Sequence, residues 1–141
     1  MTEVTFYTFV PDKLALMRQL AVKAYGQRLN VLIHTTDPAL GENLDRMLWT
    51  SPALSFLPHC RDSDNLARQT SILIGVDADK LASADILINM DDHYPALFSR
   101  FDRLLEIVST DESDRAKGRE RYKFYQERGY AIKTHDMRNM K

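Results

Sequence analysis

The sequence has only one cysteine, Cys60, among its 141 residues. A single cysteine cannot form an intrachain disulfide framework and fits a reducing compartment, so we expect a cytoplasmic protein. No apolar run approaches the roughly 18–20 residues that a membrane-spanning helix needs. The first residues, MTEVTFYTFVPDK, lack the pattern of a signal peptide. With 44% hydrophobic and 28% charged residues, the composition predicts one ordinary globular domain over residues 1–141.

The five glycines are too few and too scattered to form a standard phosphate-binding loop. None belongs to a G-x-G-x-x-G or G-x-x-x-x-G-K-[ST] motif. The first expected strand-to-helix turn, FVPDKLA, has no glycine that would let backbone N–H groups approach a phosphate. No serine lies in a G-x-S-x-G elbow. The sequence therefore argues against both standard nucleotide sites, and we expect no cofactor.

Short apolar runs alternate with segments of helical periodicity, which predicts an α/β fold with a mainly parallel sheet flanked by helices. Residues from about 136 to the end are expected to form a loose tail. The runs typical of strands are 3–9, 28–36, 70–76, 84–90 and 130–134, and the expected helices begin at Pro11-Asp12, at Thr36 or Asp37, and at about residue 112.

Residues 103–109, RLLEIVS, are ambiguous in the sequence. They follow a segment in which Phe98 and Phe101 are three residues apart, which predicts a helical turn or two. The run fits either a continuation of that helix or a strand. We favour a strand that begins at Ile107 and ends before the acidic stretch STDESD.

The overall charge of −1 conceals a marked asymmetry. Residues 1–114 carry 10 Lys and Arg against 17 Asp and Glu, whereas residues 115–141 carry 9 against 3. A basic C-terminal fifth on an acidic body favours local attraction for an acidic partner. Two alternatives remain: a direct binder of single-stranded nucleic acid, and charges that cluster on solvated helices without a role.

One triplet and one pair of adjacent residues are candidates for catalysis. Asp91, Asp92 and His93 directly follow an expected strand, where α/β folds bind ligands, and could serve a metal-dependent hydrolase. Adjacent loop residues seldom converge on one ion, however, so a polar turn is the simpler interpretation. His59 and Cys60 could be a base and a nucleophile, but cysteine is more often a small buried apolar residue.

The segment LWTSPALSFLPH places two large aromatic residues, Trp49 and Phe56, beside two prolines. If these side chains are buried, they fasten a loop to the core. If they are exposed, they form an anchor pair for a protein partner, because aromatic residues concentrate binding energy at interfaces.

The expected C-terminal helix carries a stripe of cationic and aromatic residues. At 100° per residue, Arg115, Arg119 and Tyr122 lie within about 60° of one another. Two guanidinium groups beside a phenol ring suit a carboxylate or phosphate joined to an apolar group, although a solvated basic face is the alternative. Gly118 lies on the neighbouring face, and close packing on the sheet would explain a mid-helix glycine that costs about 1 kcal/mol. Phe124 has no evident role.

Taken together, these motifs resemble the chi subunit family of bacterial DNA polymerase III holoenzyme along the whole chain. The resemblance rests on TFY, on LWTSPALSFLPH, on DILINM, and most specifically on RERYKFYQERGY. The match is poorest between Cys60 and Thr70 and again after His135.

The resemblance implies a non-catalytic member of the clamp-loader assembly, Rossmann-like in fold but without a phosphate-binding loop. It implies two protein partners. One is the psi subunit, which a helicase-like repair protein replaces in some bacteria. The other is the acidic C-terminal tail of single-stranded-DNA-binding protein, which ends in Pro-Phe. Nucleic acid would be bound only indirectly, and no metal is expected.

The resemblance also implies roles for individual residues. Arg119 matches an arginine that contacts the carboxylate end of the tail, and Tyr122 matches the tyrosine beside it. Arg115 matches a position where the family can have lysine. Trp49 and Phe56 match the aromatic pair on the surface used for psi or the helicase-like protein. Two further positions match residues that line or neighbour the tail pocket, namely Val108 and Thr134.

Overall fold

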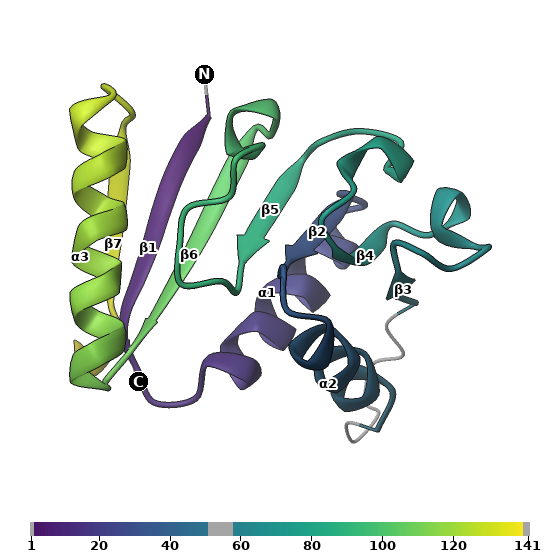
Figure 1. Cartoon of the computed structure of the whole chain (residues 1–141), viewed down its shortest axis with the longest axis horizontal. Coiled ribbons are helices and arrows are strands. Elements are labelled where there is room, and N and C mark those ends of the chain that lie inside the picture. Colours follow the sequence, from purple (N-terminus) through teal and green to yellow (C-terminus); the bar gives the residue numbers. More distant parts are fainter. Residues whose placement is uncertain (1, 51–57, 140–141) are drawn as a thin grey trace.

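A parallel sheet forms the centre of the computed structural model, which describes residues 2–50 and 58–139 (Figure 1). Within these residues the strand order is β3-β4-β2-β5-β6-β1-β7, and every neighbouring pair is parallel. This confirms the predicted α/β fold. The strands are β1 (Glu3–Val10), β2 (Val31–His34), β3 (Cys60–Arg61), β4 (Ile72–Gly75), β5 (Ile86–Asn89), β6 (Arg103–Ser109) and β7 (Ile132–Asp136).

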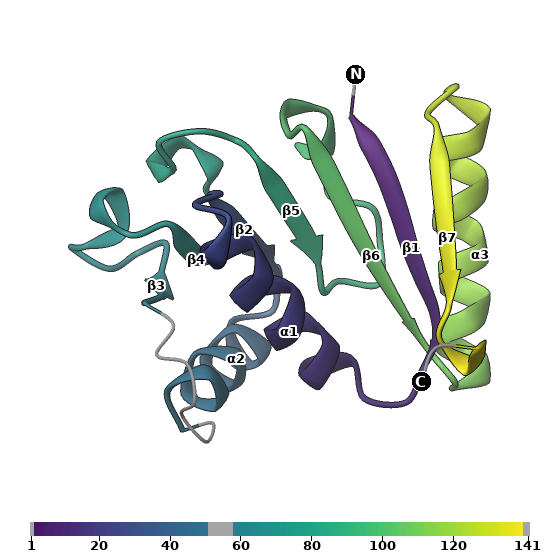
Figure 2. The same ribbon diagram turned by 180° about the vertical axis from the view of Figure 1, so that it is seen from behind.

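Helices cover both faces of this sheet. In Figure 2, α1 (Lys13–Gly26) lies in front of the central strands with α2 (Pro38–Thr50) beside it, while α3 (Glu112–Glu127) lies behind β7. The Asp12 and Asp111 carboxylates cap α1 and α3 by accepting backbone N–H bonds. None of the described helices is both long and apolar enough to cross a bilayer. Among the described residues, 3-10 turns complete the elements at Ala67–Gln69, Ala78–Lys80, Phe98–Arg100 and Met137–Asn139.

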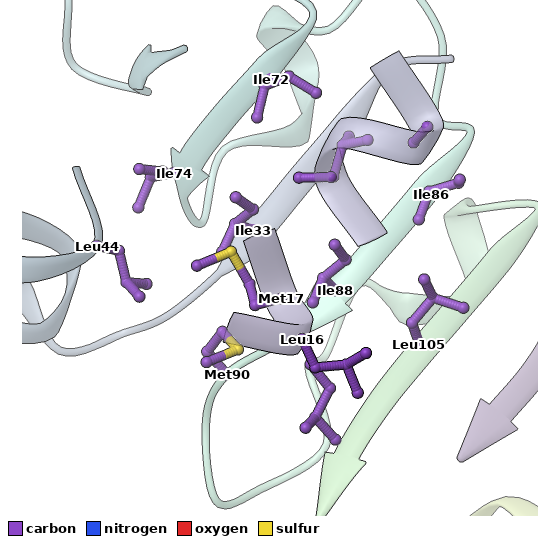
Figure 3. Close-up of a cluster of buried hydrophobic side chains, with 14 of the residues drawn as sticks. Leu16, Met17, Ile33, Leu44, Ile72, Ile74, Ile86, Ile88, Met90 and Leu105 are labelled. Carbon is purple, nitrogen blue, oxygen red and sulfur yellow. The ribbon is translucent and has the colours of Figure 1, made fainter. Parts of the chain in front are cut away.

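One hydrophobic core lies between the sheet and the helices α1 and α2. The central strands are buried on both faces, so they are apolar almost throughout, as parallel strands require. Figure 3 shows how side chains of alternate strand positions meet those of α1, with Met17 over Ile33 and Ile88. The labelled members are Leu16, Met17, Ile33, Leu44, Ile72, Ile74, Ile86, Ile88, Met90 and Leu105.

A second, more aromatic core lies beneath α3. Phe6 and Tyr125 are fully buried there, with ring centroids 6.0 Å apart. Phe124, to which the sequence assigned no role, closes the outer edge of this core. Its ring stacks on Tyr94 with centroids 3.7 Å apart, and the Arg128 guanidinium carbon lies 4.3 Å from its centroid.

Two predicted boundaries differ from the structure. The strand β6 begins at Arg103, four residues before Ile107, because residues 103–106 pair with β1 on one side and β5 on the other. The helical turn before it ends at Arg100. The expected loose tail is also incorrect for residues 136–139: Asp136 ends β7, and Met137 packs against the core.

Candidate functional site

A cavity of about 200 Å³ lies between the last residues of β1 and β6 and the first half of α3. The carboxyl ends of parallel strands are the usual place for ligands in such folds. The residues that line it are Phe6, Thr8, Phe9, Val108, Arg115, Gly118, Arg119 and Tyr122. The site is therefore built by β6 and α3, which follow one another in the chain, together with β1, which is distant from both in sequence.

Strand and helix periodicity explain why these side chains meet. Alternate positions of β1 share a face of the sheet, so Phe6 and Thr8 point to the same side. On α3 the four lining residues follow the spacing i, i+3, i+4, i+7, which is one face of a helix. The third of these elements, β6, contributes Val108, whose methyl carbon would lie 2.7 Å from a Cβ on Gly118. The predicted close packing at Gly118 is thus confirmed.

The inner part of the cavity is apolar and aromatic. The Tyr122 ring lies 5.3 Å from the Phe6 ring, centroid to centroid, at a tilt of 60°. Val108 is buried, and Tyr122 is half-buried. This floor can accept an apolar side chain and leaves the phenol oxygen of Tyr122 to a polar neighbour.

The outer part of the cavity is cationic. Arg115 donates to a Glu112 carboxylate oxygen at 3.3 Å, while the Arg119 guanidinium lies 3.9 Å from the other oxygen. The Arg119 and Glu112 side chains are 62% and 79% exposed, so this ion pair is weak and exchanges readily. An incoming carboxylate can therefore replace Glu112 and pair with both guanidinium groups.

Phe9 is a residue of the site that the sequence analysis missed. Its backbone is left-handed, with φ of 55°, which is uncommon for a bulky residue. The ring lies 4.5 Å from the guanidinium carbon of Arg115 and 3.6 Å from that of Arg138. No sequence signal marks a left-handed phenylalanine, and Arg138 lies in the stretch that was expected to be loose.

The structure brings together four of the five residues matched to a tail pocket: Val108, Arg115, Arg119 and Tyr122. Thr134 lies next to them rather than among them. It is an exposed residue of β7, the edge strand, and is paired in register with Phe6.

Trp49 lies at a separate surface, at the end of α2. Its side chain is 52% exposed, and its ring lies 4.3 Å from the His59 ring. Trp49 and Leu66, which is 58% exposed, both border a cavity of about 260 Å³. Phe56, the other member of the predicted pair, lies outside the described residues.

The side chains of Asp91 and Asp92 are directed to different partners. The Asp91 carboxylate accepts hydrogen bonds from the backbone and hydroxyl of Thr36, and Asp92 pairs with Lys117 at 3.0 Å. In the part of the chain that the structure describes, no group of three or more His, Cys, Asp and Glu residues could hold a metal ion. The triplet with His93 therefore has the geometry of a polar turn.

His59 and Cys60 likewise have separate surroundings. The side chain of His59 is buried, with Nε2 lying 3.3 Å from an Asp45 carboxylate oxygen. Burial raises the pKa of the Cys60 thiol, which disfavours the thiolate that a nucleophile needs.

A buried polar cluster, also missed by the sequence analysis, fixes α3 to the sheet. Glu106 of β6 accepts hydrogen bonds from Arg121 Nε at 2.9 Å, Tyr125 Oη at 2.6 Å and Asn89 Nδ2 at 3.0 Å. All four side chains are at most 3% exposed. Burial, followed by the charge of Glu106, raises the pKa of Tyr125, so its hydroxyl stays a donor.

A family model described as DNA polymerase III chi subunit, HolC, matches residues 1–133. The DNA polymerase III subunit chi of Pseudomonas aeruginosa is 29% identical over 140 residues, covering 96% of each chain. The subunit chi of Escherichia coli is 28% identical over 143 residues, covering 95% of this chain and 97% of its own. That of Haemophilus influenzae is 26% identical over 119 residues, covering 84% and 83%.

Proposed function

Because the chain belongs to the DNA polymerase III chi subunit family, we propose that it is a non-catalytic adaptor of the replicative polymerase. A replication accessory role follows from the family itself. The finer proposal has two parts. One surface binds the acidic C-terminal tail of single-stranded-DNA-binding protein, and another binds the psi subunit of the clamp loader. The protein would act in the cytoplasm, where the chromosome is copied.

The cavity at the ends of β1 and β6 is the observation that supports tail binding. Arg115 and Arg119 stand at its cationic side, and Phe6, Val108 and Tyr122 form its apolar floor. A C-terminal phenylalanine has a free carboxylate and an aromatic ring on the same residue. The carboxylate would pair with the two guanidinium groups, and the aromatic ring would pack against the apolar floor.

Such a site should bind a short tail weakly on its own. A hydrogen bond to a charged group contributes about 1.5–3 kcal/mol net, and few anchors correspond to a Kd on the order of micromolar. Several tails on one coating protein, together with tethering through psi, would raise the effective affinity without new contacts.

The surface around Trp49 is the candidate site for psi or for a helicase-like protein in its place. Trp49 and Leu66 are large apolar side chains that are more than half exposed. Exposed aromatic anchors of this kind carry a large share of the energy in protein interfaces. Phe56 would act with Trp49.

The test is a titration of a labelled acidic peptide ending in Pro-Phe against wild type, Arg119→Ala and Phe56→Ala. We expect Arg119→Ala to abolish peptide binding and spare psi binding, and Phe56→Ala to do the reverse. Equal loss of both activities in one variant would indicate unfolding instead. Amidating the peptide terminus should weaken binding to the wild type, because it removes the negative charge that Arg115 and Arg119 would bind.

Two further measurements address the alternative functions. A gel shift with bare single-stranded DNA should show no complex, because the adaptor needs the tail of the coating protein. Metal analysis and thermal unfolding with divalent ions should show neither a bound ion nor stabilisation. A positive result in either would favour the nucleic-acid binder or the hydrolase that uses Asp91, Asp92 and His93.

A further inference from the structure

We propose that Arg138 is a third cationic residue of the tail site, and that it contacts the acidic side chains preceding the terminal aromatic residue. The inference rests on the proposed function. It places the acidic residues of the tail beside Arg138, and it adds a residue from the segment after β7 to a site otherwise built from β1, β6 and α3.

The Arg138 and Arg115 guanidinium groups both lie against the ring of Phe9, and this contact places Arg138 near the cavity. The two guanidinium carbons lie 3.6 Å and 4.5 Å from the same ring centroid, so they are at most the sum of these distances apart. Phe9 and Arg115 both line the cavity. Figure 2 shows the C-terminal segment passing the end of β1 and the start of α3, where this cavity lies. Arg138 is therefore at the rim of the site.

The Arg138 guanidinium is held in one orientation rather than free to sweep through solvent. Its Nε and Nη2 atoms pair with the two Asp136 carboxylate oxygens at 3.0 and 2.6 Å. The same guanidinium lies over Phe9, and Met137 between the two charged residues packs against the core. A guanidinium has five N–H donors, and this pairing still leaves donors for a guest. The side chain is 61% exposed and hence accessible.

The spacing suits an extended acidic peptide. A terminal carboxylate bound at Arg115 and Arg119 directs the preceding residues outward, past the rim. An extended chain advances about 3.3–3.6 Å per residue, so the separation of Arg115 from Arg138, at most the sum of their distances from the Phe9 centroid, corresponds to at most about two residues. A carboxylate at that distance from the terminus would meet Arg138, and an uncharged side chain would gain nothing there.

The experiment measures the Kd of two labelled peptides that both end in Pro-Phe. The Asp peptide has aspartates at the preceding positions, and the Asn peptide has asparagines there. The Asp peptide should bind Arg138→Ala about 2- to 5-fold more weakly than it binds the wild type, which is the effect expected from the loss of an exposed charge pair. The Asn peptide should bind Arg138→Ala and wild type equally. The dependence of log Kd on log salt for the Asp peptide should also become shallower in the variant. Arg138→Lys should retain most of the affinity.

Arg128→Ala is the matched control. It removes the same charge and a similar guanidinium–ring contact, since Arg128 lies 4.3 Å from the Phe124 centroid, and Phe124 does not line the cavity. If Arg138→Ala and Arg128→Ala weaken binding of the Asp peptide equally, the loss reflects the overall charge of the protein rather than a contact with Arg138, and the inference fails. If Arg119→Ala binds the peptide normally, the proposed function itself fails, which is a distinguishable result.

Discussion

Gly118 of α3 lies against Val108 of β6, so close that a Cβ on residue 118 would be 2.7 Å from one Val108 methyl carbon and 3.1 Å from the other. Real Cβ atoms essentially never approach a neighbour at the shorter distance. This contact sets the height of α3 above the sheet. The height in turn decides how far Arg115 and Arg119, one turn apart, stand from the apolar floor of the cavity.

Gly118→Ala should therefore lower both stability and peptide affinity, although alanine is the better helix former. Helix propensity favours alanine by about 1 kcal/mol, but overpacking a tight contact typically costs 1–3 kcal/mol. We expect a net loss of up to about 2 kcal/mol in the free energy of unfolding, measured by urea denaturation. Tail-peptide binding should weaken as α3 moves away from Val108.

Gly26→Ala is the control for this prediction. Gly26 ends α1, and nothing lies within 4 Å of the Cβ that alanine would add. The substitution should be neutral or stabilise by up to about 1 kcal/mol. Adding Val108→Ala to Gly118→Ala should relieve the overpacking, so the two substitutions should not be additive in the free energy of unfolding. A Gly118→Ala variant as stable and as active as wild type would contradict the proposed role of the contact.

Tyr125→Phe should destabilise the protein by about 1–3 kcal/mol. The change removes a hydroxyl that donates at 2.6 Å to Glu106, and both residues are 0% exposed. A buried carboxylate that loses one donor keeps the cost of its own desolvation. Urea unfolding at neutral pH measures the loss. Tyr25→Phe, at a 40% exposed position, should change stability by less than about 0.5 kcal/mol.

The sequence predicted those features that local chemistry decides. The expected helix starts at Pro11-Asp12 and at about residue 112 agree with α1 and α3, and the expected apolar runs form the inner strands. The cationic stripe followed from helical geometry alone, because Arg115 and Arg119 lie one turn apart.

The remaining features depend on contacts between distant parts of the chain. Nothing in the segment RLLEIVS marks Glu106 as buried, and its burial is tolerable because distant residues, Arg121 and Tyr125 among them, donate to its carboxylate. Phe9 takes a left-handed conformation that phenylalanine does not signal. Residues 103–106 are a strand because two neighbouring strands pair with them.

Trp49→Ala should weaken psi binding by about 30-fold or more while leaving tail-peptide binding unchanged. Loss of an interface anchor costs about 2 kcal/mol or more, and the Trp49 surface is separate from the cavity that holds Arg119. Titration calorimetry with purified psi measures the effect. Tyr25→Ala, which removes another exposed aromatic side chain, should bind psi normally; if it weakens binding as much, Trp49 is not a specific anchor.

Asp114→Asn should make stability less dependent on pH at the acidic end. Asp114 accepts from the Ser109 backbone N–H at 2.8 Å and pairs with Lys13 at 3.3 Å. Burial opposes ionisation, but the Ser109 hydrogen bonds and the Lys13 charge prevail and lower the pKa of Asp114. A group with a lowered folded pKa contributes stability above its unfolded pKa of about 4 and loses it as the pH falls through the folded value.

The wild type should therefore exceed Asp114→Asn in stability by a constant amount between about pH 5 and pH 8. The difference should shrink as the pH falls below about 4, because the unfolded state then binds a proton before the folded state does, and it should be lost once the pH is below the folded pKa of Asp114. Urea unfolding of both proteins from pH 3 to pH 8 measures this difference. Since Lys13 begins α1 and Asp114 lies in the first turn of α3, the pair joins the two helices beside the cavity. A difference that grows on acidification would show that Asp114 is not stabilised as the carboxylate.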